Sequence, residues 1–257
     1  MTDHPIPADL TPGICSVTLR SHGIEGVVRI SAEAGLAGIE WGTDVHVSDA
    51  ASAARAKEAT GSAGMTVLSL GSYYRCGAFG DFDRVLELAT GLGAPRVRVW
   101  AGELGSAGAS QEHWDSVVKD TQRIAGLAAE RGVAVAFEYH GNTLTDSPAT
   151  TLELLDRVDH PNVGTYWQPA VGLSDQEAID SLHQVLPHVV GVHCFSWGPS
   201  AERFPLRNRA MLWQTVTEIL RDNGKDLDVM LEFVEDDLPE NVHSDAAFLH
   251  SITLGED

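Results

Sequence analysis

The sequence predicts a single (β/α)8 barrel domain that spans residues 1–257. Short apolar runs alternate along the whole chain with longer stretches of helical spacing, and strands interleaved with helices of about 10–15 residues are typical of a parallel sheet. We count eight such strand and helix pairs, and the chain length is close to the roughly 250 residues of a typical barrel. No Ser/Gly-rich linker interrupts the pattern, so a division into two domains is disfavoured.

The expected elements follow one another in a regular order. The apolar, β-rich runs predict strands over residues 13–19, 37–41, 65–71, 95–100, 133–138, 162–167, 188–195 and 227–233. The helices that can be delimited cover residues 24–36, 81–93, 111–132, 147–158, 175–186, 209–224 and 241–251. The helix at 147–158 begins with Ser147 and Pro148, which are favoured at the start of a helix.

An open, doubly wound sheet is the alternative arrangement for the same order of elements. The phosphate-binding loop of such a sheet carries GxGxxG after its first strand. This chain has LRSHGIEG there, from Leu19 to Gly26, so the closed barrel is favoured.

The composition disfavours partners that carry negative charge. The 17 Lys and Arg residues against 37 Asp and Glu give a formal net charge of −20, which repels nucleic acids and anionic membranes. Cys15, Cys76 and Cys194 form no CxxC pair, so we expect reduced thiols. The first residues have neither a basic segment nor an apolar core, and no apolar run approaches the roughly 20 residues of a membrane span. We therefore expect a soluble cytoplasmic protein that acts on a small molecule.

Polar side chains gather where the expected strands end, and Glu138 is the clearest case. The apolar run 133–137 leads directly into Glu138, and burying an unpaired carboxylate there would cost several kcal/mol. In a barrel, the carboxyl ends of the strands open into the active-site mouth. Glu138, His193 and Glu232 end the fifth, seventh and eighth expected strands, and neighbouring strands lie about 5 Å apart, so these side chains can converge. A divalent cation between them would relieve the repulsion of the carboxylates.

The chain resembles the xylose-isomerase-like barrel superfamily of sugar and sugar-phosphate isomerases and epimerases over nearly its whole length. The segments that carry the resemblance are AGLAGIEW (34–41), AFEYHGN (136–142), HPNVGTYWQP (160–169), VVGVHCFSW (189–197) and VMLEF (229–233). In that family, a glutamate from the fifth strand, an aspartate from the sixth, a histidine from the seventh and a glutamate from the eighth hold one divalent metal ion. The resemblance therefore implies metal ligands at Glu138, His193 and Glu232.

The sixth strand departs from the family pattern. The family has an aspartate there, usually followed closely by Gly-His, whereas this chain reads TYWQP, in which Gln168 carries a side-chain oxygen of suitable reach. With a neutral Gln168 as fourth ligand, the charge of the site with a dication is zero instead of −1, so we expect weaker metal binding and stronger polarisation of a substrate oxygen. Alternatively, Trp167 occupies the aspartate position and a water fills the gap, or the metal is absent.

The resemblance also implies the cofactor and the chemistry. Oxygen ligands with one imidazole favour Mn²⁺ in our interpretation, with Mg²⁺, Co²⁺ and Zn²⁺ as alternatives. As in the family's ketose epimerases, Glu138 and Glu232 are expected to form an acid/base pair, in which one removes a proton next to a carbonyl, leaving a metal-stabilised enediolate, and the other returns a proton. His140 either fixes the carboxylate of Glu138 by a hydrogen bond or moves a proton between substrate oxygens.

Aromatic and basic residues near the strand ends are candidates for substrate binding. Flat aromatic faces suit sugar rings, although packing at the barrel rim is the plainer interpretation of any single tryptophan. The family often places a basic residue after the seventh strand, and Arg203 is the candidate here. His46 in DVHV (44–47) is either a substrate contact or a loop residue beside Asp44. The candidates are Trp41, His46, Trp100, Trp167, Trp197 and Arg203.

The sequence leaves three functions open. The first is a metal-dependent isomerase or epimerase of a sugar or sugar derivative, the second is a lyase or dehydratase of a hydroxylated ketone on the same scaffold, and the third is a metal-free, non-catalytic family member. The chain lacks GxSxG, HExxH, GxxxxGK[ST] and paired CxxC motifs, which disfavours serine hydrolases, zincins, P-loop enzymes and zinc ribbons. By resemblance, the protein is expected to form a homodimer or homotetramer.

Overall fold

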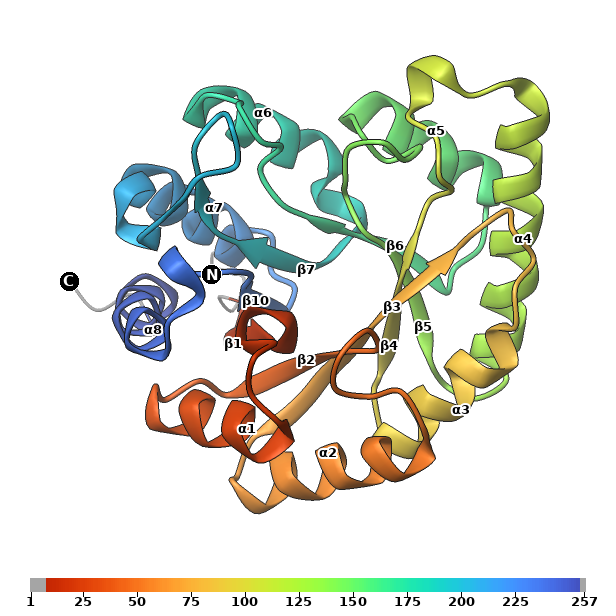
Figure 1. Cartoon of the computed structure of the whole chain (residues 1–257). Helices are drawn as coiled ribbons and strands as arrows, with labels where there is room; N and C mark the ends of the chain where they lie inside the picture. The colour runs from red at the N-terminus through yellow and green to blue at the C-terminus, as the bar shows by residue number, and fades with distance from the viewer. Residues whose placement is uncertain (1–7, 255–257) are drawn as a thin grey trace, which may run out of the picture.

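The computed structural model describes residues 8–254, which form a closed barrel of eight parallel strands inside a ring of helices (Figure 1). The order of strands around the barrel is β1-β10-β7-β6-β5-β4-β3-β2. These strands are β1 (Leu10–Cys15), β2 (Gly38–Gly42), β3 (Thr66–Arg75), β4 (Arg96–Trp100), β5 (Ala134–Phe137), β6 (Val163–Trp167), β7 (Val189–Cys194) and β10 (Leu227–Leu231). The predicted fold class is confirmed. Residues 1–7 and 255–257 of the expected domain lie outside the described residues. The first of these segments is the one in which the sequence shows neither a basic segment nor an apolar core.

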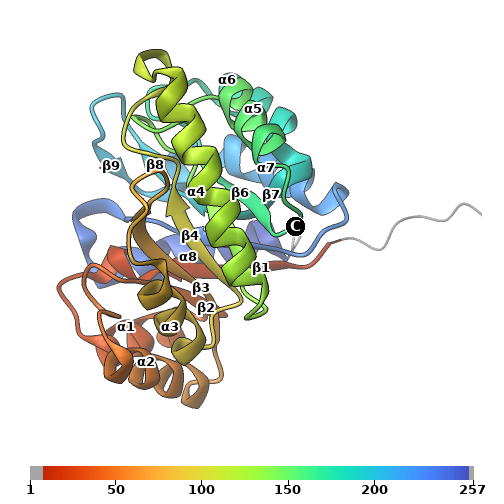
Figure 2. The same cartoon turned by 90° about the vertical axis from the view of Figure 1, so that its right-hand side faces the viewer.

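The outer layer consists of helices whose apolar faces cover the strands, as α4 does along the side of the barrel in Figure 2. They are α1 (Ile24–Glu33), α2 (Ala50–Ser62), α3 (Phe82–Leu92), α4 (Gln111–Ala129), α5 (Pro148–Val158), α6 (Asp175–Val185), α7 (Ala210–Asp222) and α8 (Pro239–Thr253). Side-chain caps fix several helix starts: Asp49, Ser110, Ser147 and Ser174 each accept a backbone N–H of the first turn. None of the helices within 8–254 is long and apolar enough to cross a membrane.

Three element boundaries differ from the sequence prediction. β1 ends at Cys15, where its pairing with β2 stops, and Ser16–Leu19 form a 3₁₀ turn instead of more strand. β3 continues past the predicted end at residue 71 to Arg75, with a shift of register against β4 on the way. The sequence analysis did not delimit α2, because this Ala-rich segment has little separation of apolar and polar faces.

The loop after β7 contains a short antiparallel hairpin of β8 (Ser196–Trp197) and β9 (Arg203–Phe204). Most buried apolar side chains lie in one large cluster, while a second, small cluster contains residues of the strands themselves, among them Cys15, Leu68, Ala136, Tyr166 and Met230. Polar and charged side chains occupy much of the remaining interior, and they cluster toward the carboxyl ends of the strands.

Candidate active site

A cavity of about 440 Å³ opens at the carboxyl ends of the strands. Its walls include Arg98 and Trp100 of β4, Glu138 and His140 after β5, Gln168 after β6 and Glu232 after β10. A larger hollow of about 940 Å³ is lined by the amino-terminal residues of β5, β6 and β7. Barrel enzymes carry their chemistry at the carboxyl ends, and the groups that can bind a metal also gather there, so the 440 Å³ cavity is the candidate active site.

Glu138, His193 and Glu232 converge as the sequence analysis expected. Each offers a ligand atom, and these atoms all lie within 4.8 Å of one another. The backbone holds both glutamates just past their strands, because the N–H of Glu138 donates to the Val99 carbonyl at 2.9 Å and that of Glu232 donates to the Cys194 carbonyl at 3.1 Å. All three residues are buried. Two carboxylates and an imidazole therefore face one point in a site with little solvent.

Gln168 lies beside these groups, whereas Trp167 faces away from them. The Gln168 Oε1 atom is 3.0 Å from Nδ1 of His193, and Gln168 lines the cavity. The indole of Trp167 is fully buried on the helix side, where Nε1 donates to Ser181 of α6 and the ring packs against Trp213. Neighbouring residues in this segment point in opposite directions, so Gln168 and not Trp167 shares the inner side with Glu138 and Glu232.

Arg98 is a central residue of the site that the sequence analysis missed. Its Nε donates to Glu40 Oε1 at 2.9 Å, and its Nη1 forms an ion pair with Glu138 Oε2. The guanidinium is buried together with both carboxylates, and a Cβ at Gly71 of the neighbouring strand would lie 2.8 Å from its Nη2. Glycine at position 71 thus makes room for the ion pairs. The alternation in RVRVW of β4 was the available signal, since it puts Arg96 and Arg98 on one face of a barrel strand.

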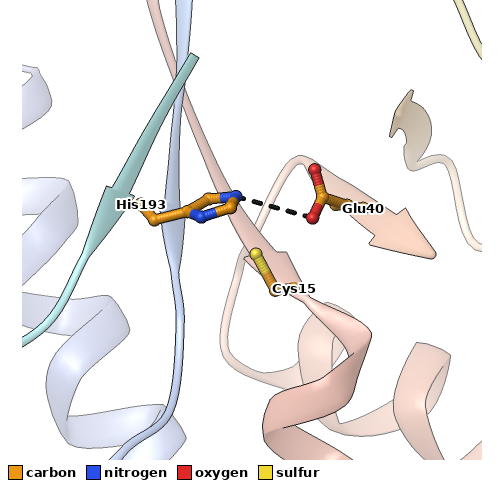
Figure 3. A group of neighbouring side chains, drawn as sticks. All are labelled: Cys15, Glu40 and His193. Atoms are coloured by element: carbon orange, nitrogen blue, oxygen red, sulfur yellow. Dashed lines mark ion pairs between the residues drawn. The ribbon is translucent and has the colours of Figure 1, made fainter. Parts of the chain in front are cut away.

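Glu40 lies behind the site and contacts both Arg98 and His193. Figure 3 shows the His193 ring facing the Glu40 carboxylate, with the Cys15 thiol beside them. Nε2 of His193 is 3.5 Å from Glu40 Oε1, and Ser69 Oγ donates to the other carboxylate oxygen at 2.6 Å. Burial acts to raise the pKa of Glu40, but the Arg98 guanidinium and His193 hold it well below its usual range. Glu40 is therefore a permanent negative charge that orients the imidazole.

The donor set fits a divalent cation. Glu40, Glu138 and Glu232 bring three buried negative charges against the single positive charge of Arg98, and a buried excess of charge is costly without a compensating cation. Burial acts to lower the pKa of His193, yet neighbouring Cys15, Glu232 and Glu40 raise it well above its ordinary value, so a proton on the ring supplies part of that compensation. A metal ion would displace this proton, because a ligating imidazole is neutral.

The contacts of His193 indicate which ring nitrogen would bind the cation. Nδ1 is directed at the other donors, 3.0 Å from Gln168 Oε1 and 3.4 Å from Glu232 Oε2, while Nε2 faces Glu40. A carboxylate on the far nitrogen is the usual partner of a metal-bound histidine. Cys15 also lies within ligand distance of Glu40 and His193, but burial raises the pKa of its thiol to about 12, so it stays protonated and is a poor ligand.

Two groups of aromatic rings line the mouth of the cavity. On one side Tyr73 stacks on Trp100 at 6.1 Å between centroids, and His140 lies 4.7 Å from Trp100. On the other side Trp197 lies 4.5 Å from Phe195 and 5.7 Å from Phe233. His140 makes a 2.6 Å hydrogen bond from Nδ1 to the Gly141 carbonyl. The predicted positions of Trp100, Trp197 and His140 at the mouth therefore hold, and Tyr73, Phe195 and Phe233 add to them.

Four expected substrate contacts lie elsewhere. Trp41 is fully buried against α2, with Nε1 donating to Thr60, and Trp167 is buried against α6, because the residue after an inward-facing strand position faces the helices. His46 is a loop residue held by Ser16 and the His22 carbonyl, and burial lowers its pKa. Arg203 forms an ion pair with Asp237 and lies over the Phe233 ring without lining the cavity.

The family model for xylose isomerase-like TIM barrels matches residues 28–252. The chain belongs to this family. A curated 3-dehydroshikimate dehydratase from Bacillus anthracis is 28% identical over 199 residues, which are 70% of this chain and 69% of that protein. Among solved structures, a probable 3-DHS dehydratase from Bacillus anthracis has a TM-score of 0.76 at 20% identity, covering 93% of this chain and 98% of its own. A D-psicose 3-epimerase from Clostridium cellulolyticum H10, crystallised with D-tagatose, has a TM-score of 0.75 at 15% identity, covering 95% of this chain and 99% of its own. The chain thus shares its fold with both a dehydratase and an epimerase.

Proposed function

We propose that the protein is a metal-dependent isomerase or epimerase that removes a proton from the carbon beside the carbonyl of a hydroxylated ketone and returns a proton from a second group. The observation that carries this proposal is the convergence of ligand atoms of Glu138, His193 and Glu232 within 4.8 Å of one another, with the Gln168 oxygen beside them. Glu138, Gln168 and Glu232 line the cavity. The bound cation, for which Mn²⁺ is our first choice, would polarise the carbonyl and acidify the neighbouring C–H bond.

The two glutamates are suited to move the proton. Glu138 and Glu232 follow β5 and β10, which are separated by two strands around the barrel, so their carboxylates approach a substrate from different directions. Burial acts to raise the pKa of Glu232, but His193 and Arg98 keep it below its usual value, so this carboxylate is ionised at neutral pH and can accept a proton. Arg98 and Glu40 fix the carboxylate of Glu138 and the ring of His193, respectively.

The position of His140 favours one of the two roles that the sequence left open. Its Nδ1 is occupied by the Gly141 carbonyl, and its ring lies against Trp100, which leaves Nε2 for a substrate at the mouth. This arrangement supports a role in exchanging a proton with a substrate oxygen more than a hydrogen bond to Glu138.

A lyase is the second candidate, favoured by the 28% identity to the dehydratase. The same deprotonation would then be followed by loss of a hydroxyl group from the next carbon instead of return of the proton. Both reactions begin with the same step, so exchange of the C–H proton with solvent should occur in either case.

Metal-loaded protein in ²H₂O, incubated with a panel of hydroxyketones and followed by NMR, distinguishes the two candidates. Deuterium incorporation with the hydroxyl groups retained indicates an isomerase or epimerase, whereas loss of water indicates a lyase. Glu232→Gln should abolish exchange, and Glu58→Gln on the exposed face of α2 is the matched control. Elemental analysis of both variants reports on the metal separately. If the parent protein binds none of Mn²⁺, Mg²⁺, Co²⁺ or Zn²⁺ at neutral pH, the proposal is wrong.

A further inference from the structure

The charges around the cavity are unfavourable for an anionic substrate. Three carboxylates line the described cavity walls, those of Glu138, Asp146 and Glu232, and Glu40 lies directly behind. With the imidazole of His193 neutral, as it is when it ligates a metal, the one positive charge of Arg98 leaves these five groups with a net charge of −3, and a bound dication would change this to −1. Both the protein alone and the metal-loaded protein therefore repel a further negative charge in the cavity.

The cations near the cavity are already engaged. Arg98 is the one arginine among the described lining residues. Its Nε is paired with Glu40 and its Nη1 with Glu138. At the rim, Arg203 pairs with Asp237, and Arg75 donates to the Gly102 carbonyl while lying 4.4 Å from the Trp100 ring. Arg20 donates to the Val17 carbonyl and lies 3.7 Å from Asp44. Among the described residues that line the cavity, no arginine or lysine is therefore free of a carboxylate partner.

The aromatic groups at the mouth stand on opposite sides of the barrel. Tyr73 and Trp100 belong to β3 and β4, while Phe195 and Phe233 follow β7 and β10, and these two strand pairs are diametrically opposed in the order around the barrel. Both groups line one cavity. A substrate ring that carries C–H groups on its faces would pack well between these flat aromatic side chains.

From these observations we propose that the cavity takes an uncharged, ring-shaped polyhydroxylated ketone and discriminates against carboxylated or phosphorylated analogues. The ketone in this inference rests on the proposed function. The absence of charge is inferred from the carboxylates around the cavity, and the ring shape from its aromatic walls. It separates this protein's substrate from 3-dehydroshikimate, which carries a carboxylate. Arg98, the one arginine in the described lining, is paired with Glu40 and Glu138, so a bound metal would be the one unpaired positive charge inside the cavity.

Equilibrium binding of shikimate and methyl shikimate tests the proposal, because the pair differs in one negative charge and neither molecule carries the ketone needed for turnover. We expect the metal-loaded protein to bind the ester about tenfold or more tightly than the acid, measured by calorimetry and by the fluorescence of Trp100 and Trp197. Equal or tighter binding of the acid overturns the proposal, and so does failure of both to bind at millimolar concentration.

A variant with a new cation checks that charge is the cause. Val171 lines the cavity and is 46% exposed, so Val171→Lys can be accommodated, with Val171→Gln as the control of similar size. We expect the lysine variant to lose most of the preference for the ester and the glutamine variant to keep it. If both variants behave alike, electrostatic discrimination is refuted. These readouts need no catalysis, so a protein that prefers the ester but exchanges no proton would refute the proposed function alone.

Discussion

Arg96 and Arg98 lie two residues apart on β4 and both face the barrel interior, yet the charges around them differ. Arg96 pairs with Asp228 of β10, and its Nε donates to the Tyr166 hydroxyl at 2.9 Å, so this layer contains one guanidinium and one carboxylate. The layer of Arg98 contains three carboxylates for one guanidinium. The charges of the Arg96 layer balance one another. The Arg98 layer has an excess of negative charge that can bind a cation.

The difference shows how a barrel separates stability from function along a single strand. In the Arg96 layer every charge has a partner from across the barrel, which holds opposite walls together. In the Arg98 layer the same residue type positions carboxylates that remain able to bind and react. The number of opposing charges distinguishes the two roles, and the Arg96 pair is also more exposed than the Arg98 pairs.

The largest expected effect comes from neutralising one carboxylate in each layer. Glu138→Gln should lower catalytic activity by about 10³-fold, because positioned acid/base groups contribute 10²–10⁴. It should also weaken metal binding by about 100-fold, since even supporting residues of metal sites contribute 10–100. Asp228→Asn should leave metal affinity, measured by competitive titration with a chelator, within about twofold of the parent. Equal losses in the two variants would erase the distinction between the layers.

A smaller but measurable difference is expected from removing each arginine. Arg98→Met should reduce the free energy of unfolding by about 3–5 kcal/mol, since it leaves the buried carboxylates of Glu40 and Glu138 without their partner. Arg96→Met should reduce it by less, because Asp228 is partly exposed. Saturating Mn²⁺ should restore more stability to Arg98→Met than to Arg96→Met, because the proposed cation site lies in the layer of Arg98. Urea unfolding with and without metal measures both effects.

The double variant Arg98→Met/Glu40→Gln refines this comparison. Replacing both members of a buried pair costs less than removing one, so we expect the double variant to be more stable than Arg98→Met alone. An additive loss would indicate that Glu40 and Arg98 act independently, contrary to their 2.9 Å contact.

The fold and the convergence of Glu138, His193 and Glu232 could be predicted from the sequence because both depend on local patterns. Alternating strands and helices specify the barrel, and Glu138, His193 and Glu232 end apolar runs. Arg98 was not predicted because the pattern RVRVW identifies a strand but does not say which of its faces enters the barrel interior. In a barrel both inward positions of β4 can be charged when partners come from other strands, and that pairing depends on the whole closed sheet.

The tryptophans illustrate the same limitation on the outer side. A position at a strand end does not by itself place a side chain at the mouth. Trp41 and Trp167 follow inward-facing residues and therefore pack against α2 and α6. Alternation along a strand would have assigned them to the helix side once Glu40 was placed inside. The ring stacks around Trp100 and Trp197, in contrast, depend on loop conformations that no local pattern specifies.

Asp245 on α8 extends the comparison between the Arg96 and Arg98 layers. It is a buried carboxylate with no guanidinium partner among the described residues. It accepts a hydrogen bond from the Leu206 N–H at 2.9 Å, and burial raises its pKa from 3.8 to about 6. A raised pKa means that the folded state holds the proton more tightly than the unfolded state, so the stabilising contribution is complete below pH 4 and is lost as the pH rises through about 6.

Asp245→Asn should therefore flatten the dependence of stability on pH. The amide oxygen can still accept from Leu206, and the variant should be more stable than the parent by about 2 kcal/mol at pH 7.5 but equal to it near pH 4. Urea unfolding at the two pH values measures the difference, with Asp222→Asn on the exposed face of α7 as the control. A variant that is less stable at pH 7.5 would show that the charge of Asp245 is needed to hold Leu206. An unpartnered buried carboxylate would then be as structural as the paired Asp228, and the count of opposing charges would no longer separate the two layers.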